Sequence, residues 1–128
     1  MKDLHSNIGL RTSIAPAVQA ATVTGAVIDR KGFESVTYVV NAGAIVGAGD
    51  FGAKIQHSDT TTSGDFVDVP AQYVIGALPA TLTADSVGKL GYVGHKQYTR
   101  LVATKAGGTS IALGAVAVLG HANERPVA

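Results

Sequence analysis

Three glycines, at residues 47, 49 and 52, give the segment GAGDFG the G-x-G-x-x-G spacing of a dinucleotide-binding loop. Such a loop needs a helix after it, because the N–H groups at the helix N-terminus bind the pyrophosphate. Gly52 is followed instead by AKIQHS, which alternates as a strand does, and Val69 and Pro70 stand where an acidic residue is expected. The D-F-G letters also occur in protein kinases, but the chain has no H-R-D loop. The glycines therefore predict a glycine-rich connection between strands and no nucleotide site.

The other chemically capable side chains are also scattered. No two histidines have a metal-ligand spacing such as H-x-x-x-H, and the segment DTTTSGD lacks the alternating acids and closing glutamate of a calcium loop. No serine or threonine lies in a nucleophile elbow. Aspartates cluster in turns, where they bond to their own backbone. We therefore expect no enzymatic activity, no cofactor and no metal. The histidines are His5, His57, His95 and His121, and the turn acids are Asp50, Asp59, Asp65, Asp68 and Asp85.

Composition narrows the class of protein further. The 128 residues suit one domain, and the absence of cysteine excludes disulfides and thiolate metal sites. The net charge of +1 gives no case for direct nucleic-acid binding. No apolar run is long enough for a transmembrane helix, and the polar residues after Lys2 do not resemble a signal peptide, so we expect no membrane contact and synthesis in the cytoplasm. Charged residues are only 15 % of the chain, which favours packing into a larger assembly.

From residue 22 onward, short alternating runs separated by turns predict an all-β fold. The interval between turns is typical of an antiparallel β-sandwich, either jelly-roll or immunoglobulin-like, and local patterns leave the strand order open. Phe66 is expected to fold over Ile55 and cover one end of the core. The expected strands are 22–30, 33–42, 53–58, 66–70, 87–94, 97–106 and 110–120, with a connection and one short strand in 71–86.

The first twenty residues differ from the rest, so we divide the chain into an extended N-terminal arm, 1–20, and a β-sandwich domain, 21–128. Gly9 and Pro16 interrupt the arm, and its four spaced aliphatic residues are Leu4, Ile8, Leu10 and Ile14. These four side chains either bind a partner or cover an edge of the domain's own core, and the sequence favours neither.

The last strand, 110–120, is apolar on both sides, which is typical of a strand buried on both faces. Val116 and Val118 share its second side. We expect the arm or another subunit to cover that side, so self-association is a further expectation.

Two segments resemble one known family. KIQHSDTTTSGDFVDVP (54–70) and LGYVGHKQYTRLVAT (90–104) resemble the paired strand units of small β-sandwich virion proteins of tailed bacteriophages, and the opening MKDLHSNI is also similar to the start of such proteins. The loop TTTSGD departs from the compact D-D-G turn that is usual there. The resemblance implies a capsid decoration or cement protein that binds the major capsid protein on the outer surface of the virion, is assembled in the host cytoplasm, and stabilises the head.

Two other functions stay open at this stage. One is a tail or head–tail joining component, which is also built on a β-sandwich. The other is a carbohydrate-binding module, which would need exposed aromatic platforms, whereas the chain has no tryptophan and only seven phenylalanines and tyrosines. Neither the oligomeric state, nor the host, nor the capsid surface or symmetry axis contacted follows from the sequence, and neither does binding to a host glycan.

Overall fold

The fold is described by a computed structural model, which places residues 3–123. The ends of the two predicted regions, residues 1–2 of the arm and 124–128 of the sandwich domain, lie outside the described residues. Ten strands and three short 3₁₀ turns (η) make up the described chain. In order they are η1 (His5–Asn7), β1 (Gly9–Gln19), β2 (Val23–Thr24), β3 (Ile28–Asp29), β4 (Phe33–Val46), β5 (Asp50–Ser58), η2 (Ser63–Asp65), β6 (Val67–Asp68), η3 (Ala71–Tyr73), β7 (Val74–Ile75), β8 (Ser86–Tyr92), β9 (Tyr98–Gly107) and β10 (Ser110–Ala122).

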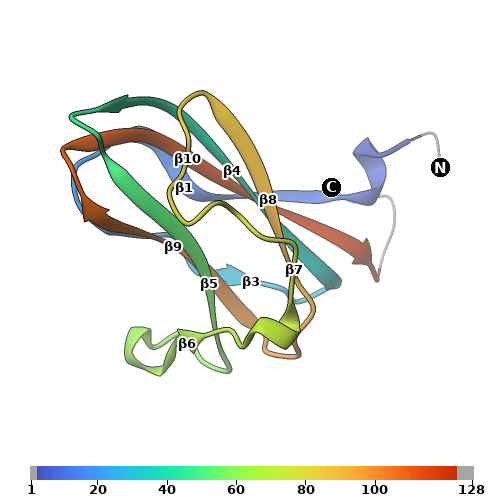
Figure 1. Cartoon of the computed structure of the whole chain (residues 1–128). Coiled ribbons are helices and arrows are strands. Elements are labelled where there is room, and N and C mark those ends of the chain that lie inside the picture. The colour runs from blue at the N-terminus through green and yellow to red at the C-terminus, as the bar shows by residue number, and fades with distance from the viewer. Residues whose placement is uncertain (1–2, 124–128) are drawn as a thin grey trace.

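The strands form two antiparallel sheets that pack on each other, so the predicted all-β sandwich is confirmed. Sheet A has the order β1-β10-β4-β8-β7. Sheet B has the order β2-β9-β5-β6, and β3 also pairs with β9. Figure 1 shows the two layers, with β5 and β9 in one and β4, β8 and β10 in the other.

Two long ribbons build most of the sandwich. β4 runs in sheet A and continues as β5 in sheet B, while β9 runs in sheet B and continues as β10 in sheet A. Their turns meet at one corner, at the left of Figure 1. A Cβ on Gly49 would overlap the carbonyl oxygen of Ser110, and a Cβ on Gly108 would overlap the backbone of Ala48.

This corner explains the glycine-rich segment GAGDFG. Gly47 and Ala48 both have positive φ, 61° and 56°, and Asp50 already begins β5. A strand therefore follows Gly47 and Gly49, as predicted, whereas Gly52 lies inside β5 and not in the connection. Gly49, together with Gly108 of the other turn, lets the two turns approach closely.

The core lies between the sheets and is filled by alternate residues of the long strands. Because successive side chains of a strand point to opposite faces, β4 and β10 each contribute a row of buried aliphatic and aromatic residues. Tyr38 and Thr99 join the sheets by a buried hydroxyl–hydroxyl hydrogen bond of 2.7 Å, and burial raises the pKa of Tyr38. The largest fully buried side chains include Tyr38, Tyr92, Phe51, Leu101, Ile111 and Leu119.

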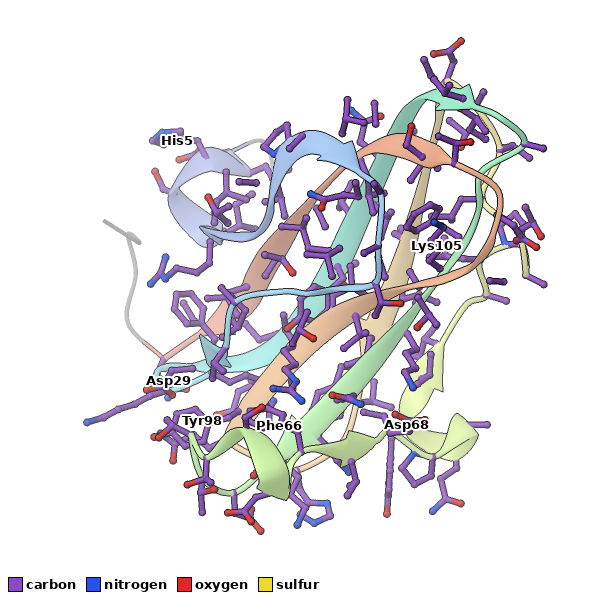
Figure 2. The ribbon with its side chains drawn as sticks, turned by 90° about the vertical axis from the view of Figure 1, so that its left-hand side faces the viewer. His5, Asp29, Phe66, Asp68, Tyr98 and Lys105 are labelled. Atoms are coloured by element: carbon purple, nitrogen blue, oxygen red, sulfur yellow. The ribbon has the colours of Figure 1, made fainter. Side chains whose placement is uncertain are left out.

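Two details of the sequence-based prediction need correction. The strand expected over 22–30 is broken at Gly25, where the chain donates one hydrogen bond to Leu101 of β9 and, through Ala26, another to Ser13 of β1. Phe66, labelled in Figure 2, is buried, but the guanidinium of Arg100 lies 4.3 Å from its ring centre, so the ring packs under that side chain on the outside of sheet B.

Residues 9–19, predicted as part of an extended arm, are β1 at the edge of sheet A. β1 pairs with β10 from Gly9 opposite Leu119 to Gln19 opposite Ile111, so it lies beside β10 in the same layer. On the outer side of β10 the arm covers Gly114, against which Pro16 packs, and Val116 stays 38 % exposed. Of the two covers expected for Val116 and Val118, the arm or another subunit, the arm therefore does not cover Val116.

Candidate interaction surface

The outer side of sheet A is the candidate interaction surface, and we call it the apolar face. Register places its side chains in rows across the strands, for example Val116 of β10, Val39 of β4 and Lys89 of β8. Aliphatic side chains dominate these rows. They include Leu10, Val18, Val39, Val87, Val116 and Val118.

A hollow of about 580 Å³ lies in the middle of the apolar face. Its floor is made by small residues, Gly43, Ala112 and Gly114, and Val87 stands at its rim with 69 % of its surface exposed. Gly114 is itself buried, because a Cβ there would lie 3.1 Å from the ring of Pro16. The bulged middle of β1 thus covers one corner of the face and leaves the rest open.

Charge is nearly absent from this face. Between the row of Leu10 and the row of Val18, Lys89 is the single ionisable residue pointing outward from the described strands of sheet A. Among the described residues, none accepts a hydrogen bond from the Lys89 ammonium group or forms an ion pair with it. Contiguous apolar surface of this kind on a folded domain marks sites of protein binding.

The four aliphatic residues predicted to bind a partner are not brought together. Leu4 and Leu10 are exposed, at 57 % and 58 %, and Leu10 belongs to the apolar face. Ile8 is half-buried, and Ile14 is 3 % exposed and lies in the core. Ile14 therefore covers the domain's own core, and partner binding by the exposed Leu4 and Leu10 stays a prediction.

A β-bulge explains why Leu10 and Ile14 point in opposite directions. Thr12 pairs with Val116 and Ile14 with Ala115, so one extra residue, Ser13, is inserted in β1. Since side chains alternate along a strand, this insertion turns Ile14 to the face opposite to that of Leu10. A second register shift between Ile14 and Ala17 returns Val18 to the face of Leu10. The Ser13 hydroxyl at this bulge is buried and has no hydrogen-bond partner among the described residues.

The outer side of sheet B, which we call the polar face, carries a connected set of hydrogen bonds. Arg100 Nε donates to Gln56 Oε1 at 2.8 Å, and Gln56 Nε2 donates to Asp68 Oδ1 at 2.9 Å. Asp68 also pairs with Lys54 at 3.1 Å, and these two partners hold the pKa of its carboxyl below the usual range. Arg100 in addition donates to Ser63 Oγ at 3.0 Å. The polar groups of this face are therefore satisfied within the chain.

A second polar cluster lies where β5 and β8 end, around a small hollow of about 190 Å³. The Tyr92 hydroxyl accepts a hydrogen bond from the backbone N–H of Lys96 at 3.1 Å and forms a second hydrogen bond with His57 Nδ1 at 2.8 Å. Burial lowers the pKa of His57, so its ring is neutral at pH 7. Lys96 pairs with Asp59 at 2.7 Å.

This cluster holds the sheets together and does not form a nucleophile–base pair. Ser58 Oγ accepts the backbone N–H of Thr60 at 3.0 Å, and no hydrogen bond joins it to His57 in the described structure. The imidazole Nδ1 of His57 is hydrogen-bonded to the Tyr92 hydroxyl. The arrangement fixes the orientation of His57 between the sheets.

Metal-ligating side chains do not gather among residues 3–123: no group of three or more histidines, aspartates or glutamates could hold an ion there. Within the same residues, no helix is long and apolar enough to cross a membrane. No family model, curated protein or solved structure matches this chain.

Sequence reasoning missed the residues that shape the hollow. The apolar second side of β10 is visible in the sequence, but Gly43 of β4 and Val87 of β8 join it only through the register of three strands. A glycine and a β-branched residue in alternating runs also occur at many other positions of the chain. Gly43 and Val87 therefore do not stand out in the sequence.

Proposed function

We propose that this protein is a structural component of the virion of a tailed bacteriophage, which binds the outer surface of the head and cements or decorates it. The observation that carries the proposal is the exposed aliphatic surface that begins at Leu4 and Leu10 and continues across sheet A. The β-sandwich and the resemblance of residues 54–70 and 90–104 to decoration proteins support the same class of function. The partner is the major capsid protein of the same virion.

The structure lowers the cost of such binding. A free arm would lose about 1–2 kcal/mol of backbone entropy for each residue ordered on the capsid. β1 is already ordered by its pairing with β10, so Leu10 is presented on a rigid edge before any partner binds. Leu4 lies next to the short turn η1, in which Asn7 N–H donates to the Leu4 carbonyl at 3.0 Å. Burial of these two side chains would contribute about 1 kcal/mol each, since each is already partly covered.

The test uses substitutions rather than deletion of residues 1–20. Such a deletion would remove β1 and Ile14, and with them an edge of the sandwich and part of its core. The double variant Leu4→Asp/Leu10→Asp leaves the strand in place and puts charge on the exposed surface. Cosedimentation with empty capsids of the same phage should show binding at least about tenfold weaker than for the wild type.

A matched control is Val67→Asp, because Val67 is 56 % exposed and lies in sheet B, away from the proposed contact. It should bind capsids as the wild type does. Undiminished binding by the double variant would contradict the assigned contact. Wild-type protein that ignores capsids but incorporates into purified tails would replace the head function by the tail or head–tail joining alternative.

A further inference from the structure

We propose that His57 controls a proton-sensitive latch at one end of the sandwich: the neutral ring holds the β8–β9 connection, residues 93–97, and uptake of a proton by the ring releases it. The latch consists of His57, Tyr92 and this connection. It shares no residue with the proposed capsid contact at Leu4 and Leu10. It therefore goes beyond the capsid function, and its absence would leave that proposal standing.

His57 and Tyr92 join the two sheets at the lower end of the molecule in Figure 1. His57 lies on β5 of sheet B and is 5 % exposed, whereas Tyr92 is the last residue of β8 in sheet A and is 1 % exposed. Their rings meet edge to face with their centres 5.6 Å apart, and the hydroxyl oxygen lies 2.8 Å from Nδ1. A change in the hydrogen bonding of the imidazole therefore acts on both sheets.

The β8–β9 connection is bound to the same hydroxyl. The backbone N–H of Lys96 donates to it at 3.1 Å. Gly94 passes so close to the hydroxyl that a Cβ there would overlap its oxygen. Arg30 also holds the connection, because its guanidinium donates to the carbonyl oxygens of Lys96 at 2.8 Å and of Gly94 at 3.4 Å. The Tyr92 hydroxyl is thus the group at which the imidazole and the connection meet.

The hydroxyl has a single proton to donate, and its two bonds show where that proton goes. Its oxygen accepts from the Lys96 N–H, so the phenolic proton still needs an acceptor. Among the described residues, His57 Nδ1 is the other atom that bonds to the hydroxyl. Nδ1 is therefore the acceptor, and the neutral ring carries its own proton on Nε2.

A second proton on the ring removes this acceptor, because an imidazolium donates from both nitrogens. Nδ1–H and the Lys96 N–H then both point at the hydroxyl oxygen, and the phenolic proton loses its partner. The carbonyl oxygens of Gly94 and Lys96 already accept from Arg30. Since a buried hydroxyl without an acceptor is unfavourable, movement of the connection away from Tyr92 accommodates the proton.

Charges close to the ring act in the same direction. Lys96 and His95 approach it from the connection, and Asp59 approaches it from the chain after β5. The Asp59 carboxylate is already paired with the Lys96 ammonium at 2.7 Å. Burial, and after it the charges of Lys96 and His95, lower the pKa of His57, whereas Asp59 opposes this shift.

The other elements around the ring add no net charge. The Arg30 guanidinium lies 5.1 Å from the centre of the Tyr92 ring, and Asp65 lines the small hollow together with His57. Opposite His57, β9 and β6 contribute Thr99 and Val67, which are uncharged. The two cations, Lys96 and Arg30, thus face two acids, Asp59 and Asp65, and an imidazolium would add an unbalanced positive charge.

The direction of the acid response follows from the lowered pKa of His57. The unfolded chain takes up this proton near the ordinary imidazole value of about 6.5, and the folded protein takes it up at a lower pH. The latch is therefore closed at pH 7. Its contribution to stability is lost as the pH falls below about 6.5 and through the folded-state pKa.

Nuclear magnetic resonance of ¹⁵N-labelled wild-type protein between about pH 7.5 and 4.5 tests the latch without any variant. The imidazole ¹⁵N shifts should show an unprotonated Nδ1 at pH 7. The protection factor of the Lys96 amide against hydrogen exchange should fall at least about threefold as the ring is protonated. Both changes should have the same midpoint. A proton on Nδ1 at pH 7, different midpoints, or constant protection of the Lys96 amide would overturn the proposal.

Two variants separate the imidazole from other acid-sensitive groups. His57→Asn keeps an acceptor near the position of Nδ1 and cannot take up a proton, so its Lys96 protection factor should stay constant over the same range. Tyr92→Phe removes the shared hydroxyl, and its Lys96 amide should exchange without protection at both ends of the range. The matched control is His5→Gln, at an exposed histidine outside the cluster, which should respond as the wild type does. An equal fall in His57→Asn and wild type would assign the response to a carboxylate and overturn the latch.

Discussion

The two outer faces of the sandwich expose opposite kinds of side chain to water. On sheet B, Arg100, Gln56, Asp68 and Lys54 form a chain of hydrogen bonds and one ion pair. On sheet A, the corresponding rows hold valine, glycine and threonine, with Lys89 as the isolated charge among the described outward residues. Both faces belong to long antiparallel strands of the same two ribbons, so the strand architecture does not cause the difference.

This difference indicates which face of the molecule would gain free energy by binding a partner. Transfer of apolar surface from water is worth about 25 cal/mol for each Å² buried. A face whose polar groups are bonded to one another gains little from a second protein, because the bonds must be replaced. The asymmetry between the faces is therefore a physical argument for the direction of assembly, made without any relative of the chain.

The largest expected effect comes from the core that joins the faces. Leu101 of β9 is fully buried among residues of both sheets. Leu101→Ala should lower the free energy of unfolding by about 2–5 kcal/mol, through lost burial and the cavity that remains. Urea unfolding followed by circular dichroism and by tyrosine fluorescence should give one coincident transition for the variant and for the wild type. Two separate transitions would mean that the sheets are not one cooperative unit and that their faces cannot be compared as parts of one domain.

An effect of intermediate size on the free energy of unfolding should distinguish the two outer faces. Arg100→Ala removes three hydrogen bonds that the guanidinium donates and the contact with the Phe66 ring, so it should cost about 1–2 kcal/mol of stability. Lys89→Ala removes a charge that no described residue pairs with, and it should change stability by less than about 0.5 kcal/mol. The midpoints of urea unfolding measure the loss of stability in both variants. Equal losses of stability in the two variants would contradict the proposed difference between the two faces.

The smallest expected effect is a response to acid that one face has and the other lacks. The hydrogen bonds from Gln56 and Lys54 lower the pKa of the Asp68 carboxyl in the folded protein below its usual range. The carboxylate therefore stabilises the fold above about pH 4, and this contribution is lost as the pH falls through the folded-state pKa. The difference in unfolding free energy between wild type and Asp68→Asn should be a fraction of a kcal/mol at pH 6, since exposed pairs are weak, and should shrink towards pH 2.5.

Lys89→Gln is the control for this response, because Lys89 has no hydrogen bond or ion pair with a carboxylate among the described residues. Its difference from the wild type should stay constant over that range. A difference for Asp68→Asn that grows on acidification would mean that the carboxylate destabilises the folded state, in conflict with its observed bonds.

Local pattern determined much of this protein. Alternation over residues 33–42, 97–106 and 110–120 places β4, β9 and β10, because a period of two allows one side of a strand to be buried. The glycines at 47–52 predict a turn followed by a strand, and β5 begins at Asp50. Strand ends were less accurate, since pairing extends β4 to Val46 beyond its regular alternation.

Tertiary structure alone decided where the first strand lies and which face its residues share. The sequence shows four spaced aliphatic residues in 1–20, but a period of two does not reveal the insertion at Ser13 that sends Ile14 into the core and leaves Leu10 outside. Nor does it tell a strand beside β10 from one lying over it, because both arrangements bury apolar side chains. Pairing in the sheet satisfies the backbone N–H and C=O groups of β1, which packing over the face would leave without partners. For that reason β1 lies at the edge of sheet A and the apolar face is left open.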